Sequence, residues 1–166
     1  LRLELGAPTE DFINDLGIKT TDWIFIKSKE DIIKNKDLLP GILKTTTFGY
    51  DGHGQYELNN LEDIKNEWHF SNNYILEKLI DLKKEISVII TRFKDGNVIV
   101  YEPIENEHQN QILIKSKIPA NISKEIFDEA QKNAKIIADK LEYVGTMCVE
   151  YFLDQRGKLF VNEIAP

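Results

Sequence analysis

The first half of the chain alternates short apolar segments with polar connections, and this pattern predicts short helices between short strands. Helices are predicted at three places: from Thr9 as N-cap to Gly17, from Ser28 to about Asn35, and from Asn60 to about Trp68. Strands are predicted at four places: 23–26, 42–44, 55–58 and 74–78. The second helix begins with Ser28 and Asp31, a pair that resembles a capping box.

The second half contains longer apolar strands and one long helix. Strands are predicted at 85–93, 98–101, 112–117, 146–153 and 158–164. The Asp95-Gly96 pair is a strong hairpin turn signal between the first two. Ser123 caps the helix, whose apolar residues recur every three or four positions up to Leu141. Because the strands are mostly linked by hairpins and the helices are segregated, we expect an α+β fold with antiparallel sheets.

Composition places the chain among globular proteins. It has 166 residues, of which 42% are hydrophobic and 30% charged, enough for one ordinary domain with its own core. The net charge of −7 argues against a nucleic acid or a membrane as partner, so an anionic ligand needs a local site.

No stretch is long and apolar enough to span a bilayer, and no signal peptide is recognised. The single cysteine, Cys148, fits a reducing compartment, and we expect a cytoplasmic location. The sequence starts at Leu1 without Met and stops at Pro166 after a predicted strand. We therefore expect it to be an excerpt of a longer protein.

The segment from Lys44 to Gln55 is the sharpest local feature. It contains three glycines and three threonines between two predicted strands. Such a loop offers backbone N–H groups and hydroxyls to a phosphate chain. It is not a Walker loop, because it returns to a strand instead of opening a helix. The alternative is a wide hairpin whose glycines only allow positive φ.

Several charged residues lie near predicted strand ends. Glu77 to Ile80 ends one strand, where backbone groups left unpaired could bind an adenine edge, and Glu85 could accept hydrogen bonds from ribose hydroxyls. The alternative is that Glu77 and Glu85 are solvated strand-end charges. His108 lies in a polar segment, 105–110, that is interpreted as a loop, where an exposed histidine is the alternative.

Glu150 and Glu163 lie on the two strands of the last predicted hairpin. If Leu153 pairs with Lys158, Glu150 faces Val161, and Glu163 lies diagonally from Glu150 on the same face. Such positions are roughly 7–8 Å apart, within reach of a shared hard cation. A register shifted by one residue would separate the two carboxylates. The alternative is a face that is simply exposed to solvent.

Taken together, these residues resemble the ATP-grasp family over nearly the whole chain. The resemblance rests on these motifs: Pro40-Gly41-Ile42-Leu43-Lys44, Gly49-Tyr50-Asp51-Gly52-His53-Gly54-Gln55, Glu77 with Glu85, Glu105-Asn106-Glu107-His108, Gly145, and Asn162-Glu163-Ile164-Ala165-Pro166. The second and the last are specific to the branch that carboxylates 5-aminoimidazole ribonucleotide in purine biosynthesis.

The resemblance implies a role for each matching residue. ATP phosphates would contact Lys44 under a lid formed by Gly49, Tyr50, Asp51, Gly52, His53, Gly54 and Gln55. Adenine would bind at Glu77, Lys78, Leu79 and Ile80, and the ribose at Glu85, with His108 also in the nucleotide site. Glu150 and Glu163 would hold magnesium, and Asn162 would join Glu163 at the phosphates. Tyr50 and Asp51 would border the ribonucleotide pocket.

The implied fold has two lobes with antiparallel sheets flanked by helices. A small lid lobe would span 1–78, and a truncated large lobe 79–166. The family's N-terminal substrate domain and C-terminal domain would lie outside this sequence, and the full-length protein would be a homodimer. The chain departs from relatives at Thr45 to Phe48, where an arginine and a Gly-Gly pair are usual, and at His53, where lysine or arginine is usual.

The function implied is ATP-dependent carboxylation of 5-aminoimidazole ribonucleotide with bicarbonate, giving N5-carboxyaminoimidazole ribonucleotide, ADP and phosphate. Two rivals remain open. One is another ATP-grasp ligase that acts on a different acid or amine. The other is a nucleotide-binding module without turnover, because the loop has less positive charge than in relatives.

Overall fold

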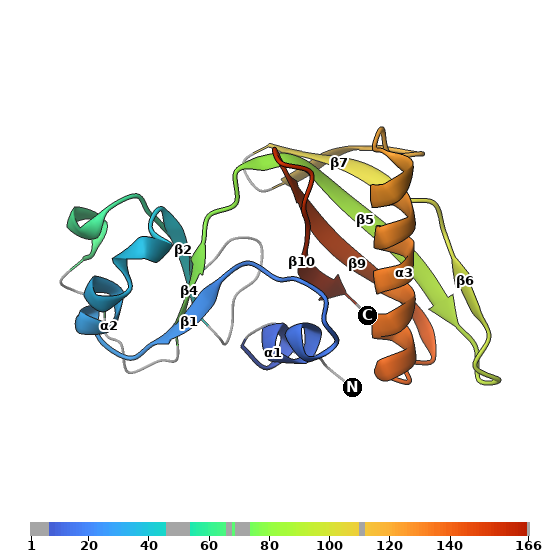
Figure 1. Cartoon of the computed structure of the whole chain (residues 1–166), viewed down its shortest axis with the longest axis horizontal. Coiled ribbons are helices and arrows are strands. Elements are labelled where there is room, and N and C mark those ends of the chain that lie inside the picture. The colour runs from blue at the N-terminus through green and yellow to red at the C-terminus, as the bar shows by residue number, and fades with distance from the viewer. Residues whose placement is uncertain (1–6, 46–53, 66–67, 69–73, 110–111, 166) are drawn as a thin grey trace. The chain divides into compact units, whose positions relative to one another are not determined.

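The computed structural model describes residues 7–45, 54–65, 68, 74–109 and 112–165. The chain divides into two compact units. The smaller unit is built around Thr21–Ile80, and the larger one around Asp81–Pro166 together with Asp11–Thr20. Each unit has a sheet of its own (Figure 1). Each also has its own hydrophobic core.

The smaller unit contains an antiparallel sheet in the order β1-β4-β2-β3. Its strands are β1 (Trp23–Ile26), β2 (Gly41–Thr45), β3 (Gln55–Leu58) and β4 (Tyr74–Lys78). The helix α2 (Lys29–Lys34) and the 3-10 turns η1 (Lys36–Leu38) and η2 (Leu61–Asp63) complete it. Its core includes the fully buried Ile26, Ile32, Leu43, Leu58 and Leu76. All four strands were predicted.

The start of α2 confirms the predicted capping box. The Asp31 carboxylate accepts hydrogen bonds from the backbone N–H groups of Lys27 and Ser28, at 2.9 and 3.0 Å. The bond from Lys27 is the main reason why the pKa of Asp31 lies below its ordinary value. Asp therefore takes the place of the usual Glu in this motif.

Two helix predictions need correction. The helix expected from Asn60 to Trp68 is only the turn η2, although Asn60 does accept a hydrogen bond from the Glu62 N–H at 2.8 Å. Asn and Asp side chains that bond nearby backbone groups favour turns over continued helix. The first helix, α1 (Ala7–Asp15), begins before Thr9, so Thr9 is not its N-cap. Pro8 fits this first turn because a helix leaves its first N–H groups without partners.

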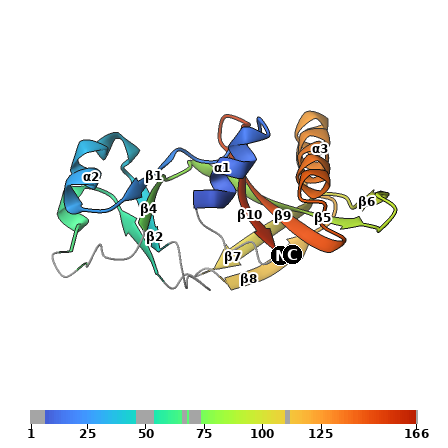
Figure 2. The same cartoon turned by 90° about the horizontal axis from the view of Figure 1, so that it is seen from below.

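The larger unit contains an antiparallel sheet in the order β10-β9-β5-β7-β8, with β6 paired to β5. Its strands are β5 (Leu82–Arg92), β6 (Val98–Val100), β7 (Ile104–Gln109), β8 (Ile112–Lys117), β9 (Gly145–Asp154) and β10 (Leu159–Ala165). The long helix α3 (Lys124–Lys140) lies against one face of this sheet (Figures 1 and 2). Ser123 caps it as predicted, accepting from the Ile126 N–H.

The core of the larger unit lies between α3 and the sheet. It is formed mainly by Ile86, Val88 and Ile90 from β5, Met147, Val149 and Tyr151 from β9, and Ala130, Ala134 and Ile137 from α3. Because side chains alternate along a strand, the residues between these on β5 and β9 face the other side of the sheet. That other side carries the candidate site.

Two predictions for the larger unit are wrong. The segment expected to be a polar loop around His108 is the strand β7, and the strand expected to begin at Glu85 is β5, which already begins at Leu82. Polar residues occur on both faces of β7, so no alternation marks it as a strand in the sequence. No helix in the described part of the chain is both long and apolar enough to cross a membrane.

Candidate functional site

Lys44 and Glu77 form an ion pair on one face of the smaller sheet. Ile42 on β2 pairs with Glu77 on β4, which places Lys44 diagonally from Glu77. The Lys44 Nζ lies 2.6 Å from a Glu77 carboxylate oxygen, and the two side chains are 23% and 9% exposed. Glu77 is therefore not a solvated strand-end charge. It fixes the position of a lysine whose ammonium keeps two further N–H donors.

Two glycines allow neighbouring backbone segments to pack closely beside this ion pair. A Cβ atom on Gly41 would lie only 2.7 Å from the Glu77 carbonyl oxygen and 2.8 Å from that of Leu38. Gly54 has φ +80°, and its carbonyl accepts a hydrogen bond from the Thr45 N–H at 3.0 Å. Gln55 follows as an exposed residue of β3 opposite Lys44. The predicted lid residues Gly49, Tyr50, Asp51, Gly52 and His53 lie outside the described residues.

The backbone after β4 is hydrogen-bonded more fully than predicted. The Lys78 N–H donates to the Asp22 carbonyl at 2.8 Å, and the Leu79 N–H donates to the Pro40 carbonyl at 2.9 Å. These two donors are therefore not free to bind adenine, contrary to the expectation. The Lys78 carbonyl accepts from the Thr21 hydroxyl at 2.6 Å and keeps a second lone pair. Leu79 is exposed and Ile80 half-buried.

In the larger unit, the sheet face turned away from α3 carries a cluster that we call the acidic face. It comprises Glu85 and Ser87 of β5, Asn106 and His108 of β7, Cys148, Glu150 and Phe152 of β9, and Glu163 of β10. His108 lies with its Nδ1 2.5 Å from a Glu85 carboxylate oxygen. Both side chains are about a quarter exposed, so His108 is neither an exposed loop histidine nor isolated.

Glu150 and Glu163 are direct cross-strand partners, but the strand register that pairs them differs from the predicted one. Leu153 pairs with Leu159 and not with Lys158, so the predicted register is wrong by one residue. A β-bulge between Val161 and Glu163 adds Asn162 as an extra residue and brings Glu163 opposite Glu150. The two carboxylates therefore share one face, and their Cβ atoms are about 4.5–5.5 Å apart in such a pair.

The environment of Glu150 disfavours the ionised form of its carboxylate. Burial raises its pKa, and the neighbouring Glu163 and Glu85 raise it further, while His108 acts in the opposite direction. Burial, with Glu150 as the second cause, raises the pKa of Cys148 to about 11. A group whose ionised form is disfavoured by burial and by like charge gains most from a cation.

The acidic face fits a divalent cation that is shared with a phosphate ligand. Carboxylate oxygens are the ligands that Mg²⁺ prefers, and in nucleotide sites one or two carboxylates suffice because phosphates and waters complete the shell. Within the described residues, no group of three or more His, Cys, Asp or Glu side chains could hold a metal ion. The opposed pair therefore suits a metal–nucleotide complex better than an all-protein metal cage.

Sequence reasoning missed four residues of this face: Ser87, Asn106, Cys148 and Phe152. Ser87 is 5% exposed and lies opposite Glu150, and Phe152 lies opposite Glu85. Asn162, which was predicted, is the half-buried extra residue of the bulge. Only the two-residue alternation of β5 and β9, starting from Glu85 and Glu150, could have identified Ser87, Cys148 and Phe152.

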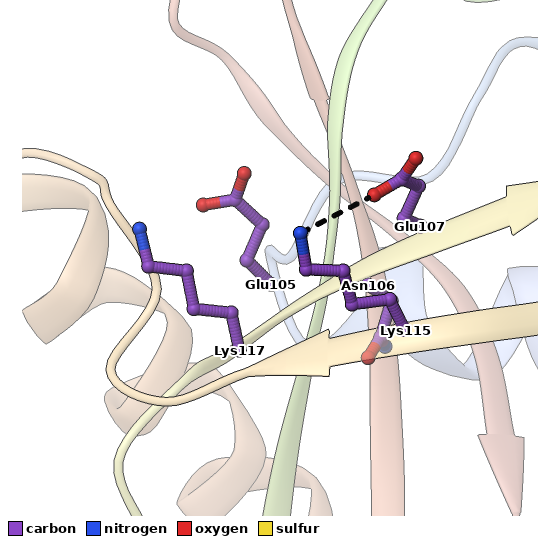
Figure 3. A pocket seen from close by; sticks show the side chains of 5 residues that line it. All are labelled: Glu105, Asn106, Glu107, Lys115 and Lys117. Carbon is purple, nitrogen blue, oxygen red and sulfur yellow. Dashed lines mark ion pairs between the residues drawn. The ribbon is translucent and has the colours of Figure 1, made fainter.

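A shallow pocket lies on the outer strands β7 and β8 (Figure 3). It is lined by Glu105, Asn106, Glu107, Lys115 and Lys117. Its carboxylates already have lysine partners, because Glu105 lies 2.6 Å from Lys84 Nζ and Glu107 lies 4.0 Å from Lys115 Nζ. By alternation, Glu105 and Glu107 face away from the acidic face, so this pocket shares only Asn106 with the candidate site.

Known proteins resemble this chain in sequence. Residues 11–166 match the ATP-grasp domain. The chain is 36% identical over 161 residues to the N5-carboxyaminoimidazole ribonucleotide synthase of Staphylococcus aureus (strain COL). The matched region covers 95% of this chain and 42% of that protein. It therefore spans less than half the length of this relative.

Solved structures resemble this chain in fold. One is N5-carboxyaminoimidazole synthetase from Staphylococcus aureus complexed with ADP, with a TM-score of 0.85 and 36% identity over 95% of this chain and 43% of that one. Another is the Aspergillus clavatus synthase complexed with ATP, with a TM-score of 0.76 and 27% identity over 93% and 42%. The chain therefore belongs to the ATP-grasp family.

Proposed function

We propose that this chain is the ATP-binding part of a ligase that carboxylates 5-aminoimidazole ribonucleotide with bicarbonate. The observation that carries the proposal is the acidic face, where the opposed Glu150 and Glu163 lie beside the Glu85–His108 pair. The resemblance to synthases of this activity, at 36% identity over 95% of the chain, supports the choice of substrate.

In this proposal, the smaller unit contributes groups for the phosphates and the base. Lys44, held by Glu77, donates hydrogen bonds to phosphate oxygens, and the loop from Gly49 to Gln55 covers them. Carbonyl groups of the segment from Glu77 to Ile80 accept from the adenine amino group, because the N–H groups of Lys78 and Leu79 are occupied. Tyr50 and Asp51 border the ribonucleotide.

The larger unit contributes the ribose and cation groups. Glu85, oriented by His108, accepts hydrogen bonds from the ribose hydroxyls, and Phe152 beside it offers an aromatic surface. Glu150 and Glu163 would hold Mg²⁺, which would neutralise phosphate charge when bound. Asn162 donates to a phosphate oxygen next to Glu163.

The reaction needs bicarbonate to be activated. An oxygen of bicarbonate attacks the γ-phosphorus, and ADP leaves. The resulting carboxyphosphate splits into carbon dioxide and phosphate, and the substrate amine attacks the carbon dioxide and loses a proton. Lys44 stabilises the charge that develops on the transferred phosphoryl group. Because carboxyphosphate hydrolyses readily, the loop must exclude water.

The test is phosphate release by the full-length protein. We expect release from ATP to require both bicarbonate and 5-aminoimidazole ribonucleotide, with N5-carboxyaminoimidazole ribonucleotide as product. Release that depends on another acid or amine would indicate a different ATP-grasp ligase. Nucleotide binding without release under any of these conditions would indicate a module without turnover. The 166-residue chain alone should bind ATP weakly and make no product.

We also propose that the full-length protein is a homodimer, which its sedimentation tests.

A further inference from the structure

A line of polar side chains crosses the larger sheet beside the carboxylates. The Ser116 hydroxyl of β8 donates to Asn106 Oδ1 of β7 at 2.9 Å, and Asn106 Nδ2 donates to the Ser87 hydroxyl oxygen of β5 at 2.9 Å. The line continues onto β9, because Ser87 lies directly opposite Glu150. It thus links an exposed strand to a carboxylate of the candidate cation site.

The direction of these bonds controls where the Ser87 proton points. Ser87 is 5% exposed, and buried hydroxyl groups donate as well as accept hydrogen bonds. Because the Asn106 amide donates to the Ser87 oxygen from the β7 side, the Ser87 proton is left for other acceptors, including those on the β9 side. Two are present on this face: the Cys148 sulfur, to which the hydroxyl is hydrogen-bonded in this structure, and the Glu150 carboxylate, which lies directly across the strand pair.

The carboxylate is the better acceptor of the two. Hydrogen bonds to an ionised group are shorter and roughly twice as strong as bonds between neutral groups, and sulfur is a weak acceptor. A carboxylate that binds a cation with one oxygen is commonly oriented by a hydrogen bond to the other, and loss of such a partner weakens metal binding.

We propose that Ser87 and Asn106 are positioning residues for cation binding: Asn106 holds the Ser87 oxygen from the β7 side, and when a cation binds, the Ser87 hydroxyl turns from Cys148 to the ionised Glu150 carboxylate and orients it. The inference rests on the proposed function, since it needs a cation bound with a nucleotide at Glu150 and Glu163. In this proposal neither residue binds the nucleotide directly, and both act through Glu150.

The test measures binding of Mn²⁺ to the full-length protein saturated with ADP, by electron paramagnetic resonance of the free ion. Ser87→Ala should weaken Mn²⁺ binding by about tenfold, the lower end for a lost partner of a metal ligand. Ser87→Thr keeps the hydroxyl and should bind as wild type does. ADP binding in the presence of a chelator should be unchanged in both variants.

Asn106→Asp tests the direction of the hydrogen bond. Aspartate has no N–H to donate, so Ser87 would donate to it and no longer to Glu150, and Mn²⁺ binding should weaken as in Ser87→Ala. In the Ser87→Ala background the same change should add little. If Asn106→Asp has its full effect without the Ser87 hydroxyl, the effect comes from the added charge and the proposal is wrong.

Two more variants serve as controls. Thr91→Val removes a hydroxyl pair, Thr91 with Thr146 at 2.8 Å, between the same strands β5 and β9 but away from Glu150, and should leave Mn²⁺ binding unchanged. Cys148→Ala should also leave it nearly unchanged. Unaltered binding in Ser87→Ala, or an equal loss in Cys148→Ala, would overturn the inference. Absence of Mn²⁺–ADP binding in the wild type would instead refute the proposed function.

Discussion

Glu150 and Glu163 repel each other across two neighbouring strands, and a cation would convert this repulsion into attraction. We predict that Glu150→Gln and Glu163→Gln each lower the turnover of the full-length protein at least about a hundredfold, since each removes a ligand and a neutralising charge. The double variant should be little worse than either single one, because both act through the same ion. Steady-state phosphate release measures all three.

Stability is the control for this prediction. The raised pKa of Glu150 means that its ionised form is disfavoured in the folded state. The protonated Glu150 side chain therefore stabilises the fold fully at a pH below the ordinary glutamate pKa. This stabilisation is lost as the pH rises through the raised pKa. Without metal, Glu150→Gln should unfold no more easily than wild type at neutral pH. Losses of turnover that multiply in the double variant would show that the two carboxylates do not share one cation.

At this scale, the residue types of the site were largely predictable and their partners were not. Glu77, Glu85, His108, Glu150 and Glu163 were all singled out from the sequence. Their contacts depend on register: Lys44 meets Glu77 diagonally across β2 and β4, and His108 meets Glu85 across β5 and β7. Register is set by long-range strand pairing, which the local pattern does not contain.

Among the elements, the close approach of β2 to its neighbours depends on a single glycine. A Cβ on Gly41 would meet two backbone carbonyl oxygens, of Glu77 and Leu38, which cannot move as a side chain can. We predict that Gly41→Ala lowers the free energy of unfolding by a few kcal/mol, on the order of an overpacked core position. Because the clash involves the Glu77 backbone, it should also weaken ATP binding through Lys44.

Gly17→Ala is the matched control for this change. Gly17 has φ +72°, but a Cβ atom added there would have nothing within 4 Å, so only the left-handed backbone is strained. Its cost should be about 1 kcal/mol, with no effect on ATP binding. Urea unfolding and calorimetric titration of the two variants give the comparison. Equal costs would show that the Gly41 contacts relax easily.

The elements themselves were predicted best where a short apolar run or helical spacing is clear. β1 and β4 were found to the residue because each is a short apolar run between polar connections, and α3 nearly so because its apolar positions recur every three or four residues. β7 was missed because Glu105, Asn106, Glu107 and His108 place polar groups on both faces. Those groups find partners on neighbouring strands, which only the assembled sheet provides.

On the scale of the whole molecule, each unit is stabilised by its own core, and charged contacts tie together elements of the larger one. The Glu105 carboxylate of β7 lies 2.6 Å from Lys84 Nζ of β5 and accepts a hydrogen bond at 3.0 Å from the Asn121 N–H, just before α3. The bond from Lys84 is the main reason why the pKa of Glu105 is lowered from its ordinary value.

This contact predicts a part of the acid sensitivity of the larger unit. A carboxylate whose pKa is lowered by folding contributes stability above its ordinary pKa, and this contribution is lost as the pH falls through the lowered value. Glu105→Gln should therefore lose stability at neutral pH and depend less on pH below about 4.5 than wild type does. Urea unfolding across the acid range measures both effects.

Glu107→Gln is the control, since Glu107 lies 4.0 Å from Lys115 with both side chains well exposed. Such surface pairs contribute little, so this variant should follow the wild-type curve. If both variants show the same pH dependence, the contact with Lys84 and Asn121 does not stabilise the fold.

The bulge at Asn162 also has a consequence for the tolerance of the chain to insertions and deletions. Deleting one residue from a strand normally turns every later side chain to the opposite face. Here, loss of Asn162 alone would leave a regular ladder in which Val161 still faces Tyr151, Glu163 still faces Glu150, and Ile164 stays in the core. A chain that lacks only Asn162 would therefore keep the strand register and the inward-facing residues of β10, and would lose only the Asn162 side-chain amide.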